Sequence, residues 1–219
     1  MTKQLALPFL NENDYAAEDF CPAPSNAAAR EWLARPESWT NGRLVLWGEA
    51  GSGKTHLLHV WAKANNAQIV EGAALQGLIR PDGPVAVDDS DLAPEPQALL
   101  HLLNAAAEEG YPVLLAARLP PMRMAYKLAD LTSRLRAAQA VEIRPPEDEL
   151  LEMLLARLCA ERQLALSLPV RNFLLLHLPR APALYREAVA RLDHAAFDRG
   201  ARVTRNVAVE ILESLVNGP

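Results

Sequence analysis

The stretch Gly48-Glu49-Ala50-Gly51-Ser52-Gly53-Lys54-Thr55 decides how this chain folds. It matches every fixed position of the phosphate-binding loop G-x-x-x-x-G-K-[ST]. The glycines let successive backbone N–H groups close around phosphates, the ammonium of Lys54 reaches the outer phosphates, and Thr55 offers a hydroxyl to Mg²⁺. We therefore expect bound ADP or ATP with Mg²⁺, and the sequence leaves open which nucleotide is resident. The residues predicted to bind it here are Gly48, Gly51, Ser52, Gly53, Lys54 and Thr55.

The flanks of this loop have the order that phosphate binding requires. A strand-like apolar run at residues 43–47 precedes it, and residues 55–62 carry apolar side chains at helical spacing. Further strands are expected at residues 68–70, 85–87, 113–116 and 141–143, and a helix over residues 97–109 ends at a glycine. Strands that alternate with helices predict an α/β fold with a parallel sheet covered on both faces.

After Pro145-Pro146 the strand pattern stops. Four helices are expected there, at residues 148–163, 170–178, 183–199 and 204–216. We therefore predict an α/β base domain at residues 15–146 and an all-helical lid domain at residues 147–219. Residues 1–24 have no sustained periodicity and are interpreted as a tail, of which residues 1–14 form the flexible part. Ser25 is the expected N-cap of a helix that follows.

Composition narrows the class of protein. The chain has 219 residues, half of them hydrophobic, which is enough to bury one substantial hydrophobic core, or a core plus a small satellite domain. Its net charge of −5 argues against a dedicated DNA-binding surface, so no direct sequence-specific DNA binding is expected. No membrane-length apolar run or signal peptide is evident, which favours a cytoplasmic protein. Cys21 and Cys159 are far apart and have no partners at metal-ligand spacing.

Two carboxylates follow the apolar run at residues 85–87. A strand that ends in this way brings an acid beside the phosphate-binding loop. Asp88 is expected to hold Mg²⁺, directly or through water, and Asp89 to orient the attacking water as general base. The alternative is a solvated acidic turn, to which Asp91 nearby lends support. The phosphate-binding loop upstream favours the functional interpretation.

The loop, the acidic strand end and the helical second half together resemble an AAA+ ATPase. Asp19-Phe20-Cys21-Pro22-Ala23-Pro24-Ser25-Asn26 resembles the segment before the phosphate-binding loop in the replication initiator DnaA, where it lines the adenine pocket. The resemblance implies that Phe20 and Asn26 lie at the nucleotide base. It extends over roughly residues 15 to 216.

Leu131-Thr132-Ser133-Arg134-Leu135, with residues 141–147 after it, resembles the DnaA stretch whose Ser-Arg carries the arginine finger. The resemblance implies that Arg134 is a catalytic arginine finger that acts in trans on the nucleotide of a partner. Arg136 is a close competitor, and a solvated or ion-paired arginine is the plainer alternative.

The N-terminus adds a second resemblance. Gln4-Leu5-Ala6-Leu7-Pro8-Phe9 is similar to the hexapeptide by which proteins dock on the bacterial sliding clamp. Such a peptide inserts Leu7 and Phe9 into an apolar pocket while Gln4 forms hydrogen bonds at its edge, and Pro8 limits the entropy lost on docking. The partner-binding residues are then Gln4, Leu5, Leu7, Pro8 and Phe9.

A DnaA-like core with this hexapeptide resembles the Hda family, the regulatory inactivators of DnaA. The sequence ends just after the expected lid, so we expect no helix-turn-helix domain for origin DNA. Membership would imply two partners: the sliding clamp (β) of DNA polymerase III, and DnaA, whose ATP hydrolysis the family promotes. The expected function is negative regulation of replication initiation.

The chain departs from the DnaA pattern at both sensor positions. The lid position of the sensor arginine falls at Ala183, with Arg180 and Arg186 as candidate replacements, and the first sensor position offers only Arg118. Loss of a charge clamp slows phosphoryl transfer by orders of magnitude, whereas nucleotide binding persists. We therefore expect weak or no intrinsic ATPase. The alternatives are a self-contained AAA+ ATPase that loads a helicase or another replication factor, and an inert nucleotide-binding scaffold; the oligomeric state stays open.

Overall fold

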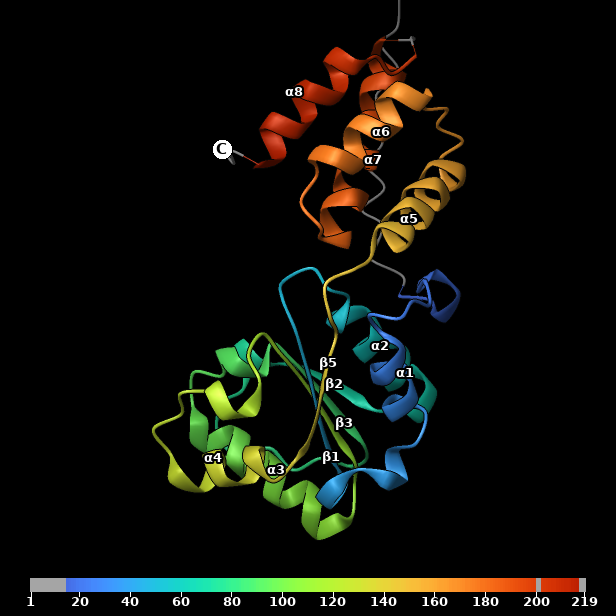
Figure 1. Ribbon diagram of the computed structural model, residues 1–219. Coiled ribbons are helices and arrows are strands. Elements are labelled where there is room, and N and C mark those ends of the chain that lie inside the picture. The colour runs from blue at the N-terminus through green and yellow to red at the C-terminus, as the bar shows by residue number, and fades with distance from the viewer. Residues whose placement is uncertain (1–14, 200–201, 217–219) are drawn as a thin grey trace, which may run out of the picture.

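The computed structural model describes residues 15–199 and 202–216. Figure 1 shows two parts, one stacked on the other. The base contains the sheet and its covering helices, from α1 (Ala27–Leu33) to β5 (Gln139–Glu142), and the lid contains the helices from α5 (Asp148–Glu161) to α8 (Arg205–Val216). The predicted fold class, an α/β unit with a parallel sheet followed by helices, is confirmed.

A five-stranded parallel sheet forms the centre of the base, in the order β2-β3-β4-β1-β5. In this order β1 lies between β4 and β5, and only β4 separates it from β3. The carboxyl ends of β1 and β3 therefore meet at the same edge of the sheet. The strands are β1 (Arg43–Trp47), β2 (Gln68–Glu71), β3 (Val85–Asp88), β4 (Val113–Ala117) and β5 (Gln139–Glu142).

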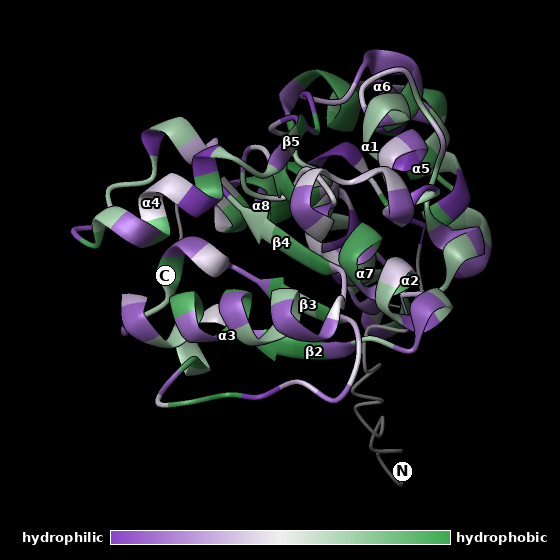
Figure 2. Cartoon of the chain, turned by 90° about the horizontal axis from the view of Figure 1, so that it is seen from below, coloured by the Kyte–Doolittle hydropathy of each residue, from purple (hydrophilic) through white to green (hydrophobic). Residues whose placement is uncertain are grey.

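Helices cover both faces of the sheet because β1, β3 and β4 are apolar on both faces. Side chains alternate along a strand, so Val45 packs into one cluster while Leu44 and Leu46 pack into the other. Figure 2 shows β3 and β4 in the hydrophobic colour beside α3. Helices α3 (Pro96–Glu109) and α4 (Ala129–Arg136) cover the first face, and α1 (Ala27–Leu33) and α2 (Lys54–Asn65) the second.

The lid has a hydrophobic cluster of its own, centred on Leu155, Leu174, Tyr185 and Leu192. Its helices are α5 (Asp148–Glu161), α6 (Leu168–His177), α7 (Pro182–Arg199) and α8 (Arg205–Val216). Helix α6 begins earlier than expected and contains Pro169, because proline is compatible with the first turn of a helix.

The segment before α1 is packed onto the protein, so the interpretation of residues 1–24 as a tail is wrong for residues 15–24. Arg157 of α5 forms an ion pair with Asp19 and donates to the Glu18 carbonyl. The expected Ser25 N-cap is also wrong, because Asn26 occupies that position. The Asn26 amide accepts a hydrogen bond from the Ala23 N–H at 3.1 Å and donates to the Cys21 carbonyl at 3.0 Å, which holds the turn before the helix.

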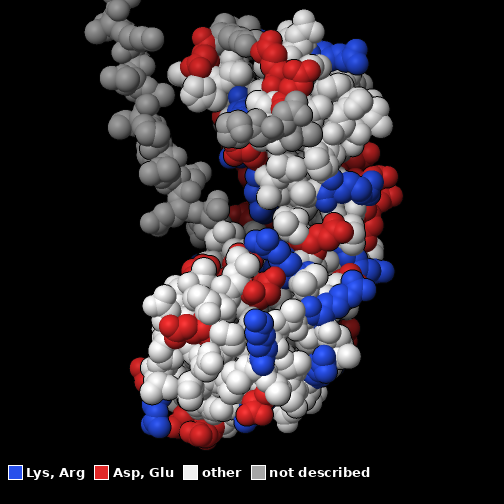
Figure 3. All heavy atoms as spheres, turned by 90° about the vertical axis from the view of Figure 1, so that its left-hand side faces the viewer, with Lys and Arg blue, Asp and Glu red and all other residues white. Residues whose placement is uncertain are grey.

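The surface in Figure 3 mixes Lys and Arg with Asp and Glu over base and lid, so this face has no continuous field of one sign. Among the described residues, none of the helices is long and apolar enough to cross a membrane.

Candidate nucleotide-binding site

The phosphate-binding loop connects β1 to α2 and folds tightly around its own lysine. Lys54 is the first residue of α2, and its buried ammonium donates to the carbonyls of Gly48 at 2.9 Å and Glu49 at 2.7 Å. A Cβ at Gly48 would lie 2.5 Å from the Ile143 carbonyl oxygen, so only glycine fits there. The loop therefore forms a narrow cradle lined by backbone groups.

The charges around Lys54 suit an anion. Burial lowers the pKa of its ammonium, and Asp89 and Asp88 oppose that shift. Beside it, the Ser52 hydroxyl is buried and has no hydrogen-bond partner among the described residues. A desolvated cation and an unpartnered buried hydroxyl in one cradle fit a phosphate group, which accepts hydrogen bonds from both.

The acidic pair lies at the carboxyl end of β3, at the same edge of the sheet as the phosphate-binding loop and separated from β1 by β4. Asp88 closes β3, is buried, and accepts a hydrogen bond from the Asp89 N–H at 3.0 Å through its own carboxylate. Asp89 adopts the left-handed conformation, with φ of 44°, and its side chain lines the same cavity as Lys54 and Thr55. Hydroxyl and carboxylate oxygens are the donor set that Mg²⁺ prefers.

A cavity of about 750 Å³ lies between the loop and the lid. The base contributes Gly51, Gly53, Lys54, Thr55 and Asp89 to it, and helices α5 and α7 contribute side chains that include Leu154, Arg157 and Arg186. The predicted residues Gly48, Ser52, Asp88, Phe20 and Asn26 do not line it.

The two residues predicted to contact the nucleotide base lie next to the loop. A Cβ at Gly53 would lie 3.2 Å from the Phe20 ring, which also meets the His56 ring edge-on at a centroid distance of 5.3 Å. The Asn26 side-chain amide forms hydrogen bonds with the backbone of the turn before α1. Their role in nucleotide binding stays a prediction.

The lid presents one of its two candidate arginines to the cavity. Arg180 is held at the junction with the base, where it donates to the Pro146 carbonyl at 3.0 Å and pairs with Asp148 at 2.6 Å. Arg186 lines the cavity. The methyl group of Ala183 lies 3.7 Å from where a Gly51 Cβ would be, so the lid contacts the loop there through a small side chain.

The Arg186 side chain contacts the α/β base domain through His56, a residue for which the sequence predicted no role. Its Nη2 donates to His56 Nδ1 at 3.3 Å, and His56 Nε2 lies 2.8 Å from the Ala16 carbonyl oxygen. Because Nε2 donates to the carbonyl, Nδ1 is the acceptor and the ring is neutral. Burial lowers the pKa of His56, the bond to Ala16 opposes this, and the charge of Arg186 adds to the lowering. No spacing rule indicated this residue.

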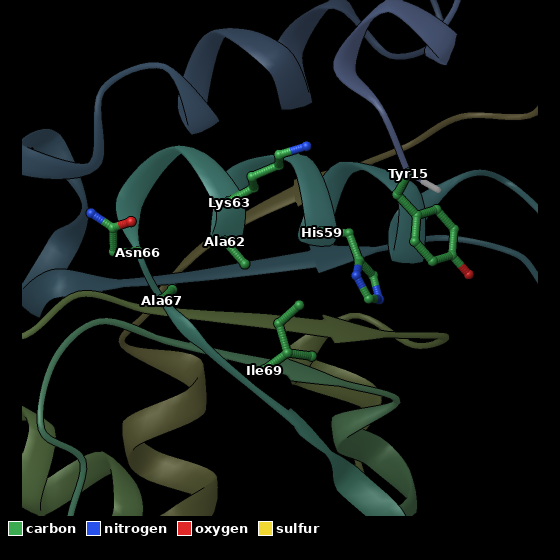
Figure 4. A pocket seen from close by; sticks show the side chains of 7 residues that line it. All are labelled: Tyr15, His59, Ala62, Lys63, Asn66, Ala67 and Ile69. Carbon is green, nitrogen blue, oxygen red and sulfur yellow. The ribbon is translucent and has the colours of Figure 1, made fainter. Parts of the chain in front are cut away.

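A smaller cavity of about 390 Å³ is lined by residues of α2 and β2. Figure 4 shows Tyr15 beside His59, and the two rings stack at a centroid distance of 4.1 Å. Lys63 and Ile69 also line this cavity. It contains no residue of the phosphate-binding loop, so the larger cavity is the candidate nucleotide site.

Arg134 lies in α4 and is half-buried. It lines a third cavity together with Arg43, the first residue of β1. The phosphate-binding loop follows the other end of that strand, about 13 Å away for a strand of this length. Arg134 is therefore remote from the cavity that holds Lys54. Arg136 on the same helix is exposed.

Two other predicted features are the first sensor and the N-terminal hexapeptide. The first sensor candidate, Arg118, lines the large cavity, and its backbone N–H donates to Asp91 at 3.3 Å. The hexapeptide at residues 4–9 lies outside the described residues, so clamp docking stays a prediction.

Comparison with known proteins identifies the fold. No family model matches the chain. An uncharacterised protein of Haemophilus influenzae is 27% identical over 240 aligned residues, which cover 99% of this chain and 100% of that protein. Among solved structures, domain III of the Thermotoga maritima replication initiation protein DnaA superposes with a TM-score of 0.77 at 18% identity, covering 94% of this chain and 98% of that domain.

Two more structures agree with that superposition. AMPPCP-bound DnaA from Aquifex aeolicus has a TM-score of 0.65 at 20% identity, over 88% of this chain and 67% of that one. The Thermotoga maritima RuvB branch migration motor has a TM-score of 0.62 at 18% identity, over 85% of this chain and 68% of that one. The protein therefore has the AAA+ fold of DnaA domain III.

Proposed function

We propose that this protein binds ADP or ATP with Mg²⁺ and stimulates ATP hydrolysis by the replication initiator DnaA, as a regulator of the Hda type. The observation that carries the proposal is the separation of Arg134 from the phosphate-binding loop of its own chain. Arg134 lies at the opposite end of β1, a strand about 13 Å long, from the phosphate-binding loop, so it is too far away to stabilise phosphoryl transfer there. It suits a nucleotide presented by a second molecule.

The residues that would hold the nucleotide come from three elements. Lys54 and the backbone N–H groups of the loop would bind the phosphates, while Thr55 and Asp88 would hold Mg²⁺. Mg²⁺ neutralises phosphate charge when it is bound. Asp89 would orient a water molecule. Arg186, which lines the cavity, would add a cation from the lid.

The proposed partners rest on the resemblances in the sequence. The hexapeptide at residues 4–9 would dock on the sliding clamp of DNA polymerase III, and Arg134 would enter the nucleotide site of DnaA. The mixed charges on the surface of Figure 3 support contact with proteins rather than a track along DNA on that face.

The deciding experiment measures ATP turnover by DnaA with and without this protein and clamp loaded on DNA. An arginine finger in trans is worth roughly 10³- to 10⁵-fold in rate, so Arg134→Ala should abolish the stimulation while nucleotide and clamp binding stay intact. Arg136→Ala, an exposed neighbour on the same helix, is the matched control and should retain it. Full stimulation by Arg134→Ala would refute the assignment.

Clamp docking is tested separately. Leu7→Ala and Phe9→Ala each remove an apolar anchor worth about 1.5 to 3 kcal/mol. The double variant should no longer co-elute with the clamp, and its melting temperature should be unchanged. Retained co-elution would exclude the hexapeptide as the docking element.

A second candidate function is a self-contained ATPase that loads a replication factor. Arg186 and Arg118, which line the cavity, favour it because they offer two cations beside the local phosphates. Turnover by the protein alone that Arg186→Ala abolishes, with no effect on DnaA, would favour this candidate. Absence of both activities would favour a nucleotide-binding scaffold.

A further inference from the structure

A second group of cations lies at the opposite end of the sheet from the phosphate-binding loop. A cavity of about 570 Å³ opens there, and its lining includes Arg43, Arg134, Ser133 and Tyr111. Arg43 begins β1, and Arg134 lies in the last turn of α4. The fold thus brings together two arginines that are far apart in the sequence.

Arg43 is buried, and few neighbouring groups offset the cost of burying its charge. Arg43 is 4% exposed, and its Nη2 donates to the Leu103 carbonyl at 3.1 Å. Burial and the neighbouring charge of Arg134 both lower its pKa. Neither arginine forms an ion pair with an acid of the described chain.

Such a pair is unfavourable in the protein alone. A buried charge is costly unless it is paired, and a second like charge beside it adds repulsion. A bound anion would remove both penalties, and guanidinium groups suit phosphate because they offer parallel N–H donors. The Ser133 hydroxyl, which lines the same cavity, is a further donor.

We propose that Arg43 and Arg134 form one anion site, which accepts the terminal phosphates of a nucleoside triphosphate held by another protein molecule. The anion site itself stands on the cavity and its charges, whereas the origin of the phosphate rests on the function proposed above. Arg43 is then a second binding residue beneath Arg134, so the reaction depends on two arginines.

The first test titrates inorganic tripolyphosphate into the full chain and follows the Nε–Hε nuclear magnetic resonance signals of Arg43 and Arg134. These signals are assigned by their loss in Arg43→Gln and Arg134→Ala. Both should shift along one binding curve. Arg43→Gln retains an N–H donor for the Leu103 carbonyl. In this variant the Arg134 signal should reach the same shift only at a tripolyphosphate concentration at least about 10-fold higher than in the wild type.

Two further variants distinguish the effect of the lost charge on anion binding from an effect on the fold. Arg43→Lys keeps the charge and should restore part of the affinity, and Arg136→Ala should leave the curve unchanged. Without anion, Arg134→Ala should raise the melting temperature, because it removes repulsion; an arginine with a purely structural role would lower it. An Arg134 signal that does not move with tripolyphosphate, or an equal affinity in Arg43→Gln, overturns the site.

The second test identifies the source of the phosphate. With ATP-bound DnaA and loaded clamp, Arg43→Gln should lower stimulated hydrolysis by at least about 10-fold. Full stimulation by Arg43→Gln, together with tripolyphosphate binding in the wild type, would overturn the partner's nucleotide as the source. If the wild type itself gives no stimulation, the proposed function fails, and the titration still decides whether the anion site exists.

Discussion

Gly72→Ala should destabilise the protein through a contact that only the folded chain creates. Gly72 follows β2, which pairs with β3 so that Glu71 lies opposite Asp88. A Cβ at Gly72 would lie 2.2 Å from the Asp89 carbonyl oxygen and 2.9 Å from that of Asp88, whereas real Cβ contacts stay above 3.0 Å. The backbone after β3 must therefore move by about 1 Å.

The size of the expected destabilisation depends on which atoms the new Cβ would contact. Overpacking costs about 1 to 3 kcal/mol, and the upper end applies here because the obstacle is backbone. For a chain of this size each kcal/mol lowers the melting temperature by about 2 to 4 °C, so we expect a fall of about 6 to 12 °C. The same shift displaces Asp88 and Asp89, so the gain in nucleotide affinity from Mg²⁺ should shrink.

Gly83→Ala is the matched control, because a Cβ there meets nothing within 4 Å. Its free energy of unfolding should change by no more than about 0.5 kcal/mol. Thermal unfolding of both variants, and nucleotide titrations with Mg²⁺ and with a chelator, supply the measurements. Melting temperatures within about 2 °C of each other would refute the steric argument.

Three other predictions concern single side chains. Lys54→Ala should weaken ADP and ATP binding by at least about 10²-fold, because charge-assisted hydrogen bonds to phosphate are lost; unchanged affinities in calorimetry would contradict this. Tyr185→Phe should leave the free energy of unfolding unchanged or raise it by up to about 1 kcal/mol, since the hydroxyl is buried with no hydrogen-bond partner in the described part of the chain; denaturant unfolding that shows a clear loss would disprove it. The folded protein holds His56 neutral with a lowered pKa, so its stability should be full above about pH 6.5 and fall as the pH drops from there through the folded pKa. The difference between the melting temperatures at pH 7.5 and pH 5.5 should therefore be smaller in His56→Gln than in the wild type, and an equal pH dependence in both would contradict the lowered pKa of His56.

Local sequence patterns predicted most of the fold, because strands and helices depend on neighbouring residues. The apolar run at residues 43–47 became β1, and the run at residues 85–87 became β3 with the following aspartate. Errors arose at element ends, where side chains compete for the same backbone groups. At the start of α1 the N-cap is Asn26, one residue after Ser25, and the Asn26 amide forms hydrogen bonds with the preceding backbone at Ala23 and Cys21.

The chemistry of the phosphate-binding loop can be predicted from the amino-acid sequence alone, because its glycines, lysine and threonine lie within eight neighbouring residues and act through local backbone geometry. That Arg186 and not Arg180 lines the cavity depends on the packing of the lid on the base, since the partner of Arg186, His56, is 130 positions away in the chain. The approach of Arg43 to Arg134 likewise depends on how α4 packs against the start of β1. Contacts between distant residues follow from sheet order and helix packing, and no pattern of neighbouring residues records them.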